Sequence, residues 1–269
     1  MIYLNLKGGL GNMMFQIATT KSISLSKKTD YSFPNLNNHI NYLSIENTYN
    51  PNVNYCSEYL ELPFLKGAKT TQSFLPVKTI NYPFHFEDIT LPISDIIIDG
   101  FFQSEKYFKN HEKEILELFL PDEKIKTYIE TKYSNLFSER TTSIHVRRGD
   151  YIRNSSYHFV QDINYFNDAI SIVDSNTDKY LIFSDDIEWC KENFKGDKFI
   201  FIENEKDYIE IYLMSMCSNN ITSNSSFSWW GAWLNQNQNK VVIGPKNWFG
   251  PSLQSLKTDD IIPNNWIKI

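Results

Sequence analysis

Strand-like and helix-like stretches alternate along the second half of the chain, and this alternation restricts the fold more than any other feature. Five short apolar runs read as strands, at residues 142–147, 179–184, 198–202, 220–223 and 240–244. Between them lie four segments with apolar residues at helical spacing, within residues 163–173, 187–194, 209–216 and 229–234. Strands that alternate with helices favour a parallel, doubly wound sheet with helices on both faces.

The beginning of the chain shows the same transition from strand to helix. Residues 2–6 are mostly apolar and predict a strand, and a helix is expected from Asn12 to Lys27. The glycine-rich segment 8–11 lies between them, where unpaired backbone N–H groups and the helix dipole would attract an anion. The same glycines are equally compatible with a simple tight turn in which Asn12 caps the helix.

The chain has 269 residues, enough for two domains of the common size of about 100–150 residues. We expect an N-terminal α/β domain over residues 1–140 and a C-terminal Rossmann-like domain over residues 141–269, with the last residues packing back on the first domain. A buried strand is expected at 95–101, whereas the segment 34–94, rich in Asn and Pro, predicts long loops and short elements.

Composition excludes several classes of protein. A formal net charge of -6 argues against a nucleic-acid partner, so any anion site must be local. The first residues lack the features of a signal peptide, and no stretch approaches the ~18 apolar residues of a membrane span. Cys56, Cys190 and Cys217 are too few and too scattered for a disulfide framework. These features predict a soluble cytoplasmic protein in a reducing compartment.

The most informative polar segment lies at the end of the first strand of the second half. Ile144 and Val146 are expected on one face of that strand, in a core. His145 and Arg147 would then point together to the opposite face. Guanidinium groups match phosphate oxygens with parallel hydrogen bonds, so Arg147 and Arg148 suit a diphosphate. The alternative is a surface arginine cluster paired with acids.

Two further polar turns follow predicted strands, so they are expected at the same edge of the sheet, where ligands bind in such folds. The first contains Asp185 and Asp186, which suit a helix cap or a ribose contact better than a metal site. The second turn, residues 224–228, could hold phosphate oxygens, or Ser226 or Ser228 could simply cap the next helix. The three tryptophans that follow are expected in the core. No spacing of histidines and cysteines indicates a zinc site.

Together these segments resemble the bacterial α-1,2-fucosyltransferases of glycosyltransferase family 11. The resemblance is carried by five motifs in the family's order, at residues 8–16, 100–108, 145–151, 183–186 and 224–234. The His-x-Arg-Arg-Gly-Asp-Tyr and tryptophan-rich motifs are the specific ones. Met13 and Asn219 depart from the family, where Gln and His are usual, and neither is assigned a role.

The resemblance implies a GT-B fold, in which two Rossmann-like domains face each other across a cleft. It implies inverting transfer of L-fucose from GDP-β-L-fucose to the 2-hydroxyl of a terminal galactose, with no metal or other cofactor. The implied partners are GDP-fucose and a galactose-terminated oligosaccharide acceptor. A lipid-linked acceptor would bring the protein to the inner face of the membrane as a peripheral protein.

The resemblance also implies roles for individual residues. Arg147 corresponds to the essential phosphate ligand, with His145 beside it, and would stabilise the charge that grows on departing GDP. The implied donor-binding residues are Gly11, Asn12, Arg147, Arg148, Asp185, Ser225, Ser226, Phe227 and Ser228. Asp150 is either a base for the acceptor hydroxyl or a salt-bridge partner that fixes an arginine. A fucosyltransferase of another linkage, or a non-catalytic protein that binds nucleotide sugars or glycans, remains an alternative.

Overall fold

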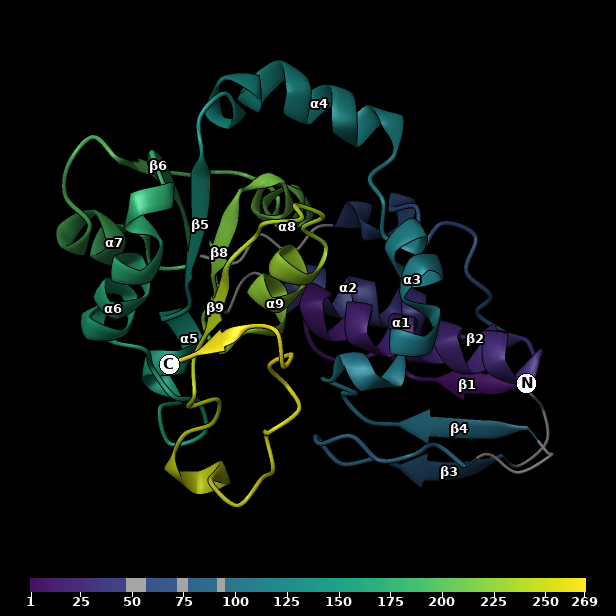
Figure 1. Cartoon of the computed structure of the whole chain (residues 1–269). Coiled ribbons are helices and arrows are strands. Elements are labelled where there is room, and N and C mark those ends of the chain that lie inside the picture. The colour runs from purple at the N-terminus through teal and green to yellow at the C-terminus, as the bar shows by residue number, and fades with distance from the viewer. Residues whose placement is uncertain (47–56, 72–76, 91–94) are drawn as a thin grey trace. The chain divides into compact units, whose positions relative to one another are not determined.

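The computed structural model describes residues 1–46, 57–71, 77–90 and 95–269 (Figure 1). The chain divides into two compact units. The N-terminal unit comprises Met1–Glu46, Tyr55–Leu120 and Lys257–Pro263, and the C-terminal unit is formed mainly by Pro121–Leu256 together with Asn264–Ile269. Each unit has its own parallel β-sheet, so the chain is an α/β protein with two sheets.

The N-terminal unit has a four-stranded sheet in the order β2-β1-β4-β3, and all neighbouring strands are parallel. The strands are β1 (Ile2–Leu4), β2 (Tyr31–Ser32), β3 (Lys78–Asn81) and β4 (Ile96–Asp99). The helices are α1 (Leu10–Lys27), α2 (Leu36–Glu46) and α3 (Glu112–Leu118), with short 3₁₀ turns η1 (Ser57–Glu61), η2 (Glu105–Tyr107) and η3 (Lys109–His111).

The C-terminal unit has a six-stranded parallel sheet in the order β10-β9-β8-β5-β6-β7. Its strands are β5 (Thr141–Val146), β6 (Lys179–Ser184), β7 (Phe199–Phe201), β8 (Asn219–Ile221), β9 (Val242–Gly244) and β10 (Ile267–Lys268). Its helices are α4 (Glu123–Tyr133), α5 (Gly149–Arg153), α6 (Ile163–Val173), α7 (Ile187–Asn193), α8 (Asp207–Met216) and α9 (Ser226–Trp233), with 3₁₀ turns η4 (Ser134–Phe137), η5 (Asp174–Asn176) and η6 (Pro251–Leu253).

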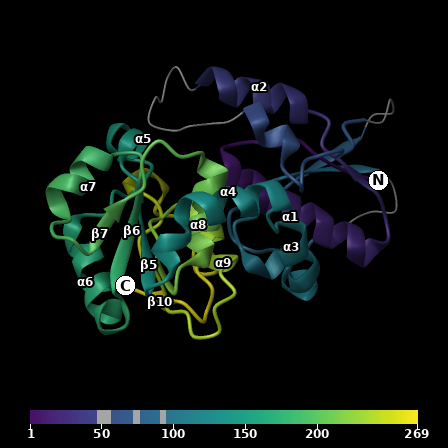
Figure 2. The same cartoon turned by 90° about the horizontal axis from the view of Figure 1, so that it is seen from above.

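Helices cover both faces of the C-terminal sheet, with α6 and α7 on one face and α8 and α9 on the other (Figures 1 and 2). Ile144 and Val146 are fully buried in the core that α6 and α7 complete. His145 faces the other way, and its ring centroid lies 5.3 Å from that of Phe227 on α9. The predicted alternation along this strand is confirmed, because successive side chains of a strand point to opposite faces.

The boundary between the units lies at Leu120/Pro121, whereas the sequence placed it after residue 140. Helix α4 belongs to the C-terminal unit because it packs against α8. Glu205, which precedes α8, accepts hydrogen bonds from Tyr133 at 2.6 Å and from Lys132 at 2.8 Å. These bonds tether the end of α4 to its own unit.

The chain returns to the N-terminal unit at Lys257–Pro263. Within this segment Asp260 accepts a hydrogen bond from the Phe86 backbone N–H at 2.6 Å. The last residues of the chain belong to the C-terminal unit instead, since β10 pairs with β9 in the C-terminal sheet. The expected return of the chain therefore involves residues 257–263 rather than the terminus itself.

Helix α1 starts two residues earlier than expected. Its N-cap is Gly9, which has no side chain, and Asn12 lies inside the first turn of the helix. The interpretation of Asn12 as the cap was therefore wrong. Helix α2 was also missed, because its Asn-rich sequence hides the buried positions Leu36, Ile40 and Leu43.

Trp229 and Trp230 are fully buried and Trp233 nearly so, which confirms their assignment to the core. None of the described helices is long and apolar enough to cross a membrane. Cys190 and Cys217 are buried and unpaired, while Cys56 lies outside the described residues.

Gly231 allows α9 to pack closely on α8. A Cβ at this position would lie 2.7 Å from Met214 Cβ, which is closer than real Cβ atoms approach. Gly231→Ala is therefore expected to lower the free energy of unfolding by about 1–3 kcal/mol, although alanine has the higher helix propensity. Urea unfolding of both proteins measures this difference. An unchanged or raised stability would show that the helices can separate at little cost.

Candidate functional site

The candidate site residues of the C-terminal unit lie around the carboxyl end of β5. Strand β5 connects through α6 to β6 on one side, whereas β8 lies on its other side, so the strand order reverses at β5. Val146 lies beside Ser184 in the sheet, and Ile144 lies beside Ile221. Ligands of doubly wound sheets bind outside the carboxyl ends of the strands at such a reversal. The turns after β5, β6 and β8 meet at this edge, as expected from the sequence.

The side chain of His145 connects β5 to the turn that follows β8. Its Nδ1 lies 2.9 Å from Ser223 Oγ, just after β8, and both side chains are buried. Burial, assisted by the positive charge of Arg147, lowers the pKa of His145 to about 3. The ring is therefore neutral at physiological pH, which suits a hydrogen-bonding and orienting role rather than proton transfer.

This buried imidazole predicts a pH-dependent stability. In the unfolded protein, His145 becomes protonated as the pH falls below about 6.5. In the folded protein, the ring becomes protonated only near pH 3, because its pKa is about 3. The free energy of unfolding should therefore fall as the pH drops through this interval, by up to about 1.4 kcal/mol per pH unit. His145→Gln should show a shallower decline in urea unfolding between pH 6.5 and 4.5. Parallel curves for the two proteins would contradict the buried neutral ring.

Arg147 is held by two carboxylates. Its Nη2 lies 2.7 Å from Asp150 Oδ1, and its Nη1 lies 3.2 Å from Asp185 Oδ2. The guanidinium carbon lies 5.4 Å from the centre of the Tyr151 ring. Only 18% of the side chain is exposed. The structure thus shows the pairing with acids that the sequence left as an alternative, and it fixes the guanidinium in one orientation.

Arg148 is anchored in the same way. Its Nε lies 3.1 Å from Asp186 Oδ2, and its guanidinium lies over the Trp189 ring at 4.2 Å. Its backbone N–H donates to Asp185 Oδ1 at 2.9 Å. The next residue is Gly149, where a Cβ would lie 2.7 Å from Asp185 Oδ2. Asp185 therefore lies directly against the turn that carries both arginines.

The two acids after β6 are engaged by N–H donors. Asp186 is the N-cap of α7 and accepts from the Trp189 backbone N–H at 3.4 Å. The interpretation as a helix cap is confirmed for Asp186. In the described part of the chain, no group of three or more His, Cys, Asp or Glu side chains could hold a metal ion.

The serine-rich turn after β8 begins α9. Its N-cap is Ser225, whose Oγ accepts from the Phe227 backbone N–H at 3.4 Å, so the expectation of a cap at Ser226 or Ser228 was off by one or more residues. The Ser228 hydroxyl is buried and donates to the Ser225 carbonyl at 3.3 Å. The first N–H groups of α9 lie at the carboxyl edge of the sheet, where a helix N-terminus favours an anion.

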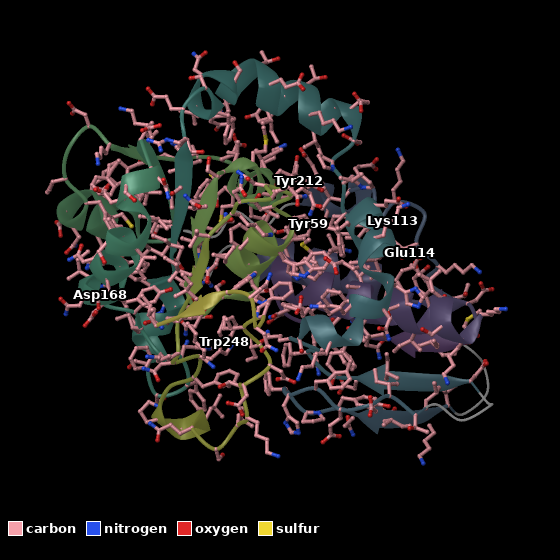
Figure 3. All side chains as sticks on the ribbon, viewed as in Figure 1. Tyr59, Lys113, Glu114, Asp168, Tyr212 and Trp248 are labelled. Carbon is pink, nitrogen blue, oxygen red and sulfur yellow. The ribbon has the colours of Figure 1, made fainter. Side chains whose placement is uncertain are left out.

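Asn224 is a scaffold residue whose role the sequence did not reveal. Its amide donates to the Phe159 and Trp248 carbonyls, each at 2.8 Å (Trp248 is labelled in Figure 3). Its own carbonyl accepts from the Tyr151 hydroxyl at 3.0 Å. Asn224 therefore connects the turn after β5, the turn after β8 and the loop after β9. Its place in a polar turn at a strand end was the available signal.

Packing contacts hold the segment that follows Arg147 in place. Tyr151 stacks on His158, with ring centroids 4.2 Å apart and planes 8° apart. The Gly250 backbone N–H donates to the Tyr157 carbonyl at 2.8 Å, and a Cβ on Gly250 would lie 2.4 Å from the Ser155 carbonyl oxygen. Close backbone packing of this kind limits the movement of the arginine-bearing turn.

Gly11 and Asn12 belong to the N-terminal unit, whereas the other predicted site residues belong to the C-terminal unit. Asn12 Oδ1 accepts from Gln103 Nε2 at 2.7 Å, and Gln103 is 6% exposed. Gly8 has φ of +76°, which glycine adopts readily, and a Cβ there would lie 2.4 Å from Asn12 Nδ2. The glycine turn and Gln103 together fix the Asn12 amide at the start of α1.

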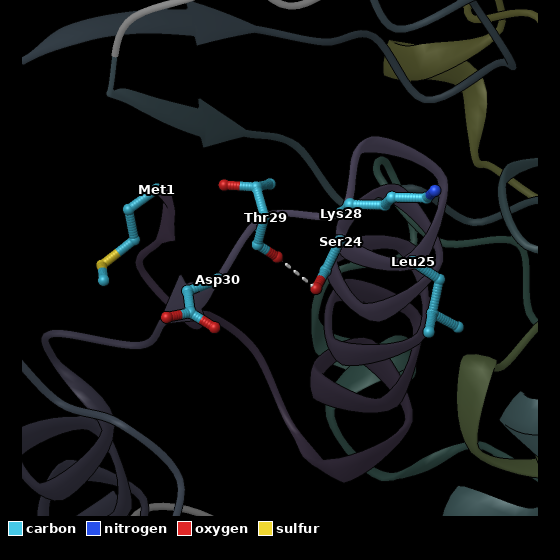
Figure 4. Close-up of a pocket in the computed structure, with 6 residues that line it drawn as sticks. All are labelled: Met1, Ser24, Leu25, Lys28, Thr29 and Asp30. Carbon is cyan, nitrogen blue, oxygen red and sulfur yellow. Dashed lines mark hydrogen bonds between the residues drawn. The ribbon is translucent and has the colours of Figure 1, made fainter.

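A hollow of about 650 Å³ lies at the opposite end of α1 (Figure 4). It is lined by Met1, Ser24, Leu25, Lys28, Thr29 and Asp30. Met1 precedes β1 and Asp30 precedes β2, so the hollow lies at the amino edge of the N-terminal sheet. No residue of the candidate site contributes to it.

The whole sequence, residues 1–269, matches the family described as Glycosyl transferase family 11. An alpha-1,2-colitosyltransferase of Escherichia coli is 30% identical over 296 aligned residues, which cover 100% of this chain and 98% of that protein. The O-antigen biosynthesis glycosyltransferase WbnK of Escherichia coli is 34% identical over 183 residues, 63% of this chain and 59% of that protein.

Solved structures show the same fold at low identity. NodZ alpha-1,6-fucosyltransferase co-crystallised with GDP has a TM-score of 0.53 at 12% identity, with 86% of this chain and 91% of that chain covered. An Arabidopsis thaliana FUT1 mutant in complex with GDP has a TM-score of 0.50 at 11% identity, with 99% and 75% covered. The fold is of the GT-B type, and the full-length match identifies the chain as a member of glycosyltransferase family 11.

Proposed function

We propose that this glycosyltransferase transfers L-fucose from GDP-β-L-fucose to the 2-hydroxyl of a terminal galactose, with inversion to an α-1,2 linkage. The observation that carries the proposal is the full-length similarity to an alpha-1,2-colitosyltransferase. A second support is the arrangement of Arg147 and the start of α9 at one sheet edge, which suits a diphosphate.

The proposed role of Arg147 is to bind the diphosphate and to stabilise the charge that develops as the bond from fucose C1 to phosphate breaks. A guanidinium has five N–H donors, so two carboxylates and a diphosphate can share it. Asp150 and Asp185 hold it in place before the donor arrives, and the reaction then needs little reorganisation. Three carboxylates accompany the two arginines, so directed N–H groups rather than net charge would attract the donor.

The other residues of the C-terminal unit receive supporting roles in the proposal. Arg148 and the turn formed by Ser225, Ser226, Phe227 and Ser228 would contact the donor. His145 would orient the end of β5 through Ser223. Asp185 was expected to contact the nucleoside, but its contacts to both arginines support a role in positioning them.

Asp150 is assigned to Arg147 rather than to the acceptor. Its carboxylate forms a 2.7 Å ion pair with the guanidinium, so it already has a partner within the same turn. An oxocarbenium-like transition state with late proton loss needs no strong base. In the N-terminal unit, Gly11 and Asn12 are proposed to contact the donor phosphate through the start of α1.

The proposed acceptor is a galactose-terminated oligosaccharide, and the WbnK relative supports an O-antigen glycan. A lipid-linked acceptor would bring the reaction, which we propose to be cytoplasmic, to the inner face of the membrane. The colitosyltransferase relative favours one second candidate, in which the transferred sugar is colitose rather than fucose.

The experiment is a transfer assay on the purified chain with GDP-fucose and GDP-colitose, each offered with a panel of galactosides. NMR of the product should show an α-1,2-linked fucose. Another linkage, a preference for colitose, or GDP binding without transfer would replace the proposal by the corresponding alternative.

A chelator should leave the rate of transfer unchanged, because Asp185 and Asp186 are engaged by arginines. Inhibition by the chelator that manganese reverses would contradict this expectation.

A further inference from the structure

We infer that Lys7 and Asp99 form a subsite for a neutral sugar ring at the carboxyl edge of the N-terminal sheet. The inference rests on the proposed function, because the ring would be the galactose of the acceptor. Strand β1 connects through α1 to β2 on one side, and β4 lies on its other side, so the strand order reverses between β1 and β4. Lys7 follows β1, Asp99 ends β4, and their side chains form an ion pair across this reversal.

The backbone that carries Lys7 is fixed by buried side chains. Gln16, which is fully buried, accepts from the Lys7 N–H and donates to the Lys7 carbonyl, both at 3.0 Å. Asn35 makes the same pair of bonds to Leu6, both at 2.8 Å. Binding of a ligand here costs little conformational entropy, because the backbone at Lys7 is already ordered.

An aromatic stack supports the ion pair. Lys7 Nζ lies 4.8 Å from the centre of the Phe101 ring, and Phe84 stacks on Phe101 with centroids 5.1 Å and planes 10° apart. The adjacent Phe102 has φ of +54°, a left-handed conformation that bulky residues rarely adopt. Its fully buried ring packs edge-on against Tyr107 at 5.2 Å and holds this strained turn. Retained strain beside a strand end is typical of functional sites.

The chemistry of this group suits a pyranose. An ammonium donates to hydroxyl oxygens and a carboxylate accepts from hydroxyl groups, so the pair can bind neighbouring hydroxyls of one ring. Lys7 and Asp99 are 37% and 42% exposed, so both can be reached from solvent. Their charges cancel, which favours a neutral sugar over a phosphate. Exposed ion pairs contribute little to stability, so removing this pair should leave the fold intact.

The test uses the whole chain and the variants Asp99→Asn and Lys7→Met. Initial rates are measured at saturating GDP-fucose over a range of lactose concentrations, and lactose binding to the GDP-loaded protein is followed by saturation-transfer NMR. Each variant should raise the lactose KM by about tenfold or more, the value of one hydrogen bond to a charged group. The Kd for GDP, measured calorimetrically, should stay within about twofold.

The matched control is the ion pair of Lys69 and Asp30, which lies at the amino edge of the same sheet with an Nζ to Oδ2 distance of 2.9 Å. Asp30→Asn and Lys69→Met should leave the lactose KM unchanged. Normal lactose KM values in both Asp99→Asn and Lys7→Met would overturn the subsite and leave the proposed transfer standing. The wild type could also bind lactose without transferring any sugar. If Asp99→Asn then abolished lactose binding, the result would support the subsite and overturn the proposed transfer. Absence of lactose binding to the wild type would overturn the subsite.

Discussion

Replacement of Arg147 by alanine is expected to lower kcat about 100- to 1000-fold, the usual cost of removing one preorganised donor that stabilises a developing charge. Lysine should rescue only a small part of this loss, because an ammonium cannot reproduce the two-pronged geometry held by Asp150 and Asp185. Initial rates of GDP release with a galactoside acceptor measure the effect. The KM for donor should rise less than kcat falls if the interaction strengthens in the transition state.

Arg153 provides the control for this prediction. It lies on α5, six residues after Arg147, and is exposed. Arg153→Ala should retain near-normal turnover. Equal losses in Arg147→Ala and Arg153→Ala would indicate a general effect of positive charge, and near-normal turnover of both Arg147 variants would exclude the phosphate role.

Replacement of Asp185 by alanine is expected to destabilise the protein by about 1–3 kcal/mol, because it leaves the Arg148 N–H without its acceptor and leaves Arg147 with Asp150 as its remaining carboxylate. One carboxylate oxygen, Oδ2, forms an ion pair with Arg147. The other, Oδ1, accepts a hydrogen bond from the Arg148 N–H. Asp185→Asn should retain a bond to the Arg148 N–H and lose less stability. Urea unfolding measures both effects, and donor kinetics should show a fall in kcat for the folded variants.

Asp178 is the matched control for Asp185. It also accepts from an arginine N–H and guanidinium, those of Arg140, at 3.1 Å and 2.7 Å, but the pair is exposed. Exposed pairs contribute little, so Asp178→Ala should change stability only slightly. Similar losses in Asp178→Ala and Asp185→Ala would show that burial of the site is not what makes Asp185 important.

The sequence predicted the alternation of strands and helices in the C-terminal unit well, because short apolar runs and segments with helical spacing alternate there. The orientation of His145 relative to Ile144 followed from the alternation of one strand. Helix α2 was missed, because a stripe of Leu36, Ile40 and Leu43 is weak beside so many Asn residues. Helix ends were predicted to within one to three residues only, as the caps at Gly9 and Ser225 show.

The partners of the site residues could not be predicted in the same way. The contact of Arg147 with Asp150 is local, but its contact with Asp185 depends on β5 and β6 being neighbours in register. The roles of Asn224 and Gly149 depend on loops that come together only in the folded unit. Such contacts are set by tertiary packing, which the pattern of a single sequence does not contain.

The most direct test is a crystal structure of the protein with GDP. We expect a diphosphate oxygen within hydrogen-bonding distance of the Arg147 guanidinium, at about 2.8 Å, at the carboxyl ends of β5 and β8. An Arg147 side chain that contacts only Asp150 and Asp185, with the diphosphate bound elsewhere, would contradict the proposed role of this residue.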